Sequence, residues 1–141
     1  MHRNDTDIRV ECVSITYIFV EEYLLSLENL IMNYISFGDC LRLREICPKL
    51  DYLEMRTDYE KSILSKRVTE QEFVPSVTNV CLLFNRWEDT NVKMNNIENL
   101  LSFFPNLSIL QVEQRATQIA KEQWNDMAQK MGITIIDICC S

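Results

Sequence analysis

CPKLDYLEM at 47–55, VPSVTNVCL at 74–82 and FPNLSILQV at 104–112 share one pattern, and together they hold all three prolines of the chain. Each stretch reads apolar-Pro-x-L-x-x-L-x-L, where L stands for any aliphatic residue. Proline lacks a backbone N–H and disfavours helix in the residue before it, so it ends a preceding helix. The L-x-L alternation that follows is typical of a β-strand with one buried face. Each stretch therefore predicts a helix end followed at once by a strand.

The same frame fits three further places that lack proline, beginning at Val10, Leu27 and Ile133. Most frames recur at the spacing of about 20–29 residues that leucine-rich repeats show. The pattern predicts repeat strands near 10–15, 27–32, 50–55, 77–82, 107–112 and 133–138.

Helical patterns occupy the chain between these strands. We expect helices over 19–26, 39–47, 58–73, 91–104 and 116–131. In the last of these, apolar residues recur at helical spacing, and Gly132 follows as the left-handed residue that ends a helix. Asp39 is a suitable N-cap for the helix of 39–47. Alternation of strands and helices predicts a parallel sheet.

Polar residues within the strand patterns decide between two parallel architectures. A doubly wound sheet is buried on both faces, and its strands read as continuous apolar runs. Here Ser14, Glu54, Gln111 and Asp137 alternate with the apolar positions. This favours a sheet with one buried face and one solvent-exposed (wet) face. Neighbouring helices pack with their axes about 8–10 Å apart, whereas neighbouring strands lie about 4.8 Å apart, so the helical side of the solenoid must be longer than the strand side. We expect an α/β leucine-rich-repeat solenoid, formed by residues 1–141 as a single domain, with parallel strands on the concave face and helices on the convex face.

The proline-marked frames at 47–55 and 104–112 resemble the leucine-rich repeats that follow the F-box in F-box/LRR proteins. The resemblance covers residues 10–138. It implies selection of substrates for a cullin-RING ubiquitin ligase, with a Skp-type adaptor and a cullin as partners. We find no F-box-like helical module before the first frame, so these two partners are expected only if an F-box exists elsewhere.

Composition and charge exclude several classes of partner. The formal net charge is −7, which disfavours nucleic acid and anionic lipid because both are bound by clustered lysine and arginine. No apolar run approaches the 18 or so residues that span a bilayer, so we expect no membrane partner. The six cysteines follow no disulfide or zinc framework. We therefore expect an intracellular protein, cytoplasmic or nuclear, with reduced thiols.

The sequence offers no catalytic constellation. His2 is the single histidine, so no Ser-His-Asp or Cys-His pair is expected in the core. The two glycines, Gly38 and Gly132, cannot form a phosphate-binding loop. Cys139 and Cys140 lack neighbouring ligands for a metal. We predict a protein that is not an enzyme and has no cofactor and no metal.

The wet positions of the strands form the better candidate site. The frame places three residues of each strand on the concave face, among them Ile135, Asp137 and Cys139 in the last strand. Aromatic residues with a nearby arginine have the composition of interface hot spots. The predicted partner-binding residues are Tyr34, Tyr52, Arg56, Leu83 and Phe84.

Three interpretations of function follow from this surface. The first is a protein–protein interaction module that binds another protein through the concave face. The second is the substrate-recognition part of an F-box-type ubiquitin ligase subunit that lacks its F-box. The third is a truncated repeat fragment with no independent function.

Overall fold

The computed structural model describes residues 7–10, 25–32, 37–57, 68–84, 93–114, 117 and 119–138. Within these ranges the side chains of 7–10, 32, 37–41, 56–57 and 84 are not described. The predicted helix of 19–26 lies mostly outside the described residues, as do Cys12, Ser14, Tyr34 and Cys139–Cys140.

The described part forms one six-stranded sheet in which the strands lie side by side in chain order. The strands are β1 (Asp7–Val10), β2 (Asn29–Met32), β3 (Tyr52–Thr57), β4 (Asn79–Phe84), β5 (Ile109–Val112) and β6 (Thr134–Asp137). Every neighbouring pair is parallel. The α/β class and the parallel sheet predicted from the sequence are confirmed, and the sheet is open between β1 and β6.

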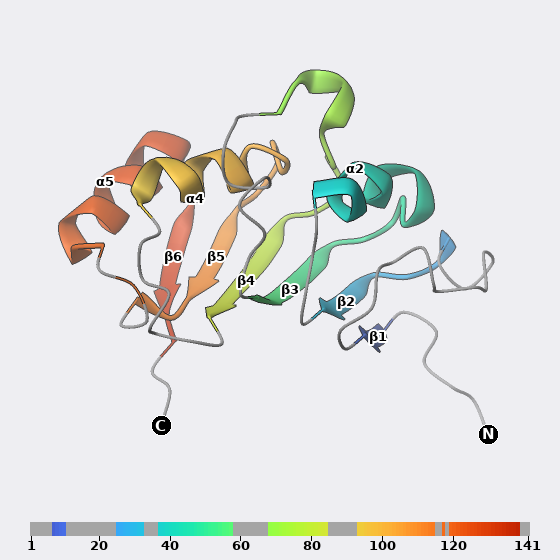
Figure 1. Ribbon diagram of the computed structural model, residues 1–141, viewed down its shortest axis with the longest axis horizontal. Helices are drawn as coiled ribbons and strands as arrows, with labels where there is room; N and C mark the ends of the chain where they lie inside the picture. The colour runs from blue at the N-terminus through green and yellow to red at the C-terminus, as the bar shows by residue number, and fades with distance from the viewer. Residues whose placement is uncertain are drawn as a thin grey trace.

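Three α-helices of the described part lie on the same side of this sheet (Figure 1). They are α2 (Phe37–Ile46), α4 (Met94–Leu101) and α5 (Lys121–Met131). Their inward residues, such as Leu43, Ile97 and Trp124, join the strand residues in one apolar core. The helix-covered face of the sheet therefore carries the core.

The three prolines stand in three equivalent turns. The N–H of Leu50 donates to the carbonyl oxygen of Cys47 at 3.1 Å, and Val77 with Val74 and Leu107 with Phe104 repeat this bond at 3.4 and 3.1 Å. Proline is the second of the four residues in each turn, a position that suits its fixed φ. The turns also contact one another, since the side-chain amide of Asn106 donates to the carbonyl of Pro75 at 2.9 Å.

Beyond each turn, the carbonyl group of the residue just before the preceding strand anchors the next strand. The Glu28 carbonyl accepts from the N–H groups of Asp51 and Tyr52, at 2.9 and 3.0 Å. The carbonyls of Asp51 and Thr78 do the same for the strands that begin at Asn79 and Ile109. This repeated contact sets Leu53 beside Val80, and Val80 beside Leu110. All three side chains are fully buried, as the proline-marked frames predicted.

The outer two frames are corrected by the register. Ile8, not Val13, aligns with Leu30, and Val10 is the last residue of β1. At the other end Ile135, not Ile136, aligns with Leu110. In a strand a shift of one residue exchanges the two faces, so Ile135 and Asp137 stand in the rows of Leu110 and Val112 on the helix-covered face, and their predicted place on the concave face is wrong.

The connection into β6 explains this last shift. Gly132 has φ 69° and ends α5 in the left-handed conformation that the sequence predicted. The N–H of Ile133 then donates to the carbonyl of Ala128 at 3.0 Å, so only Thr134 reaches the Ser108 carbonyl. A left-handed glycine has replaced the proline turn, and the strand begins one residue earlier than the frame implies.

Helix boundaries differ from the predicted ones for local reasons. α2 begins at Phe37, so Asp39 lies inside the helix and is not its N-cap. The predicted helix of 58–73 does not extend through its described part, where Glu70–Glu72 forms the 3₁₀ turn η2. There the Glu72 carboxylate accepts from the N–H of Thr69 at 2.8 Å. Pro75 follows closely and disfavours a longer helix.

Replacement of Leu53 by alanine tests the core. Its side chain is fully buried between Leu30 and Val80, so Leu53→Ala should lower the free energy of unfolding by about 3 kcal/mol. Ile136→Ala is the matched control, because Ile136 is 46% exposed, and it should cost less than about 1 kcal/mol. Urea titrations followed by circular dichroism would measure both. Equal losses would contradict the assignment of the two faces.

Candidate functional site

The second face of the sheet carries the candidate site. It consists of the residues that alternate with the core positions along β2 to β6, and no described helix packs on it. We call this the helix-free face. Its members are Asn29, Ile31, Tyr52, Glu54, Asn79, Cys81, Leu83, Ile109, Gln111, Thr134 and Ile136.

Two hydrogen bonds between side chains organise the centre of this face. The Tyr52 hydroxyl donates to Glu54 Oε1 at 2.8 Å, and Gln111 Nε2 donates to Asn79 Oδ1 at 3.3 Å. The first pair lies along β3, and the second joins β5 to β4. Burial first, and the bond to Glu54 second, raise the pKa of Tyr52 well above its ordinary value. Tyr52 is therefore a neutral donor at any physiological pH.

Cys81 lies between these two pairs, since it is in register with Glu54 on one side and Gln111 on the other. It is only 3% exposed, although it stands on the helix-free face. The neighbouring long side chains therefore form a layer over the middle of the sheet. This layer carries a phenol, a carboxylate and two carboxamides beside the apolar Ile31, Leu83 and Ile109.

The predicted site residues fall into two groups. Tyr52 and Leu83 belong to the helix-free face, and both are partly buried. Arg56 is in register with Leu83, and Phe84 with Thr57, but the side chains of Arg56 and Phe84 are not described. Tyr34 lies outside the described residues.

Sequence reasoning missed Ile136 as a member of this surface. The frame assigned it to the core, whereas it is 46% exposed. The signal that could have revealed it is Gly132, because a left-handed helix end makes the connection shorter than a proline turn.

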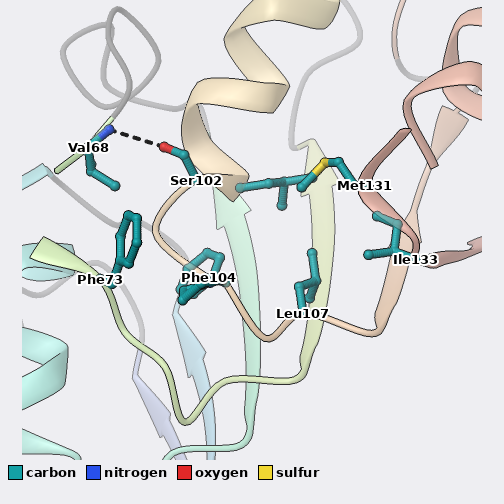
Figure 2. A pocket seen from close by; sticks show the side chains of 9 residues that line it. Val68, Phe73, Ser102, Phe104, Leu107, Met131 and Ile133 are labelled. Carbon is teal, nitrogen blue, oxygen red and sulfur yellow. Dashed lines mark hydrogen bonds between the residues drawn. The ribbon is translucent and has the colours of Figure 1, made fainter. Parts of the chain in front are cut away.

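A cavity of about 310 Å³ lies on the other side of the sheet, near the ends of α4 and α5. Figure 2 shows side chains that line it from the segment before η2, the third proline turn and the start of β6. Its lining residues are Val68, Phe73, Leu101, Ser102, Phe104, Pro105, Leu107, Met131 and Ile133. None of these side chains ionises, so the cavity offers no acid, base or nucleophilic pair.

The hydroxyl of Ser102 in this cavity is already used. It accepts from the Val68 N–H at 3.1 Å and donates to the Asn99 carbonyl at 2.5 Å. The hydroxyl thus ties the segment before η2 to the end of α4. We assign it a structural role.

Ser102→Ala should destabilise the fold by about 1–2 kcal/mol, because the partly buried N–H of Val68 loses its acceptor. Ser108→Ala is a matched control. The Ser108 hydroxyl only donates, at the exposed surface, to the Thr78 carbonyl, which also accepts two backbone N–H groups, so its loss should cost about 0.5 kcal/mol or less. Thermal unfolding of the two variants would test this difference, and a larger loss in Ser108→Ala would refute the role of Ser102.

The described residues hold no group of three or more histidine, cysteine, aspartate or glutamate side chains that could bind a metal ion. Likewise, no helix in the described ranges is long and apolar enough to cross a membrane. Comparisons of the chain with protein-family models, with curated proteins and with solved structures found no match. The site is therefore interpreted from its own geometry.

The two described thiols lie on different faces. Cys47 belongs to the core, is fully buried, and forms no disulfide. Burial raises the pKa of its thiol from 9.0 to about 12 because the thiolate loses its hydration. Cys47 is therefore an unreactive core residue at neutral pH.

This shift predicts a loss of stability in alkali. Below pH 9.0 the thiol is protonated in both states; between pH 9.0 and about 12 only the unfolded chain releases the proton. Stability should thus fall by about 1.4 kcal/mol per pH unit in this window. Urea titrations at about pH 8 and about pH 10 should show a larger decrease for the native chain than for Cys47→Ala. An equal decrease in the free energy of unfolding of both proteins would show that Cys47 does not contribute to the loss of stability in alkali.

Proposed function

We propose that this chain is a leucine-rich-repeat solenoid that binds another protein through its helix-free face and catalyses no reaction. The observation that carries the proposal is the composition of that face. Partly buried apolar side chains from three strands, Ile31, Leu83 and Ile109, share this face with the Tyr52–Glu54 pair. The core does not use these side chains, because it lies on the opposite face.

The repeated turn supports the solenoid. Three proline turns of the same geometry feed three consecutive parallel strands, and each strand pairs only with its neighbours in chain order. Such a unit cannot bury its apolar face alone and is completed by the next unit. The sheet that results presents a broad surface.

The chemistry of the face favours a partner with apolar and basic side chains. Tyrosine and aliphatic residues supply contact area, and aromatic anchors contribute much of the energy of protein interfaces. Glu54 is the described charge at the centre of the face, and the chain carries a net charge of −7. Complementary charge speeds association and selects the partner. Arg56 is in register with Leu83 and continues the alternation of Tyr52 and Glu54 along β3, so it extends the proposed surface. Phe84 stands in the row of Leu82 and is left out of it, and Tyr34 stays a prediction from the sequence.

Leu83→Glu tests the proposal by placing a charge among the apolar residues of the helix-free face. The matched control is Gln129→Glu, which adds the same side chain on the exposed surface of α5. Immobilised native chain and both variants would be incubated with the same cell extract, and retained proteins would be identified by mass spectrometry. We expect a defined protein to be retained by the native chain and by Gln129→Glu but not by Leu83→Glu.

Titration of that protein in purified form should then give at least a tenfold higher Kd for Leu83→Glu, equivalent to about 1.4 kcal/mol. Circular dichroism must show that the variant is folded. Retention of the same proteins by all three chains would contradict a binding role for this face.

A further inference from the structure

The last strand of the described sheet has one unpaired edge. β6 pairs with β5, and among the described strands it has no neighbour on its other side (Figure 1). Thr134, Ile136 and Asp137 are exposed, and Ile136 is 46% exposed. Ile135 is only partly buried, whereas its counterpart Leu110 in β5 is fully buried. The core is thus incomplete at this edge.

The hydrogen bonds to β5 determine which backbone groups of β6 point outward. The N–H of Thr134 donates to Ser108, and that of Ile138 donates to Val112, both at 2.9 Å. Successive residues of a strand direct their N–H and C=O groups to opposite sides. The N–H and C=O groups of Ile135 and Asp137 therefore face away from β5, toward the unpaired edge.

We propose that β6 pairs antiparallel with β6 of a second copy of this chain, about a two-fold axis at Ile136. In this register Ile135 exchanges two backbone hydrogen bonds with Asp137 of the second copy, and Asp137 exchanges two with Ile135 of the second copy. The two Ile136 side chains meet on the helix-free face. The dimer is independent of the binding function proposed above, because it uses the edge of the sheet and not its centre.

Geometry and charge exclude the neighbouring registers. Residues that lie directly opposite each other in a sheet direct their side chains to the same face. A two-fold axis between two residues would oppose residues of different faces, so the axis must pass through a residue. An axis at Ile135 would require the N–H of Ile133, which already donates to Ala128. An axis at Asp137 would set two carboxylates opposite each other, which is destabilising. Ile136 is the position that avoids both problems.

The strand itself favours a second copy over another occupant. An isologous pair supplies every donor, acceptor and apolar contact from the same few residues, and two-fold dimers are the commonest oligomers. β6 contains three β-branched residues and one charge, so it lacks the lysine or proline that commonly protects an edge strand. Neighbouring helices lie farther apart than neighbouring strands. The joined sheet would therefore bend away from the two α5 helices.

Ile136→Lys should convert the dimer into a monomer. Two lysines would face each other at the axis, where opposed Cα atoms lie about 4.5 Å apart. Sedimentation equilibrium over a range of concentrations should show a dimer for the native chain and at least a tenfold higher dimer Kd for the variant. Ile31→Lys is the matched control, because Ile31 occupies the same row of the helix-free face in β2. Its dimer Kd should change less than threefold.

A mixing experiment tests the two-fold axis. Ile136→Glu should also be monomeric, whereas an equimolar mixture with Ile136→Lys should form a heterodimer, since lysine and glutamate would then be opposed. A monomeric native chain, or a dimer that survives Ile136→Lys, would overturn the proposal. Loss of the dimer in both Ile136→Lys and Ile31→Lys would also overturn it, because it would indicate association through the whole helix-free face.

Discussion

One carbonyl group that accepts two consecutive N–H groups holds the start of each inner strand. Glu28, Asp51 and Thr78 supply these carbonyls in turn. The contact fixes the register between neighbouring strands, and the register decides which side chains enter the core. With this bond in place, Leu30, Leu53, Val80 and Leu110 align in one buried row. The two faces of the sheet, and therefore the core and the candidate surface, depend on it.

The inner part of the fold could be predicted from the sequence because proline has a direct geometric meaning. Pro48, Pro75 and Pro105 fix the second position of a turn, and the strand then begins at a constant distance from it. The outer frames lack this marker, and both were assigned to the wrong register. At β6 the difference arises from a left-handed Gly132, which the sequence shows but whose effect on register requires the helix cap to be known.

The candidate surface was predictable as a face and not as a set of contacts. Alternation placed Tyr52 and Leu83 on the wet side of their strands. The bond from Tyr52 to Glu54 and the burial of Cys81 depend on side-chain directions and on neighbours in β4 and β5. Ile136 was assigned to the core because the frame missed a shift of one residue, and such a shift exchanges the faces. Errors of register thus affect the site more than the fold.

The order of the strands has a consequence for how stability is distributed along the chain. Each described strand pairs only with the strands before and after it in the sequence, so local opening can begin at an end without disturbing the middle. Amide protons in such an arrangement exchange with solvent at rates that reflect their distance from the ends. The slowest amides should belong to β3 and β4, which share the longest ladder, and the fastest to β1. Amide exchange would thus vary along the chain in the order of the strands.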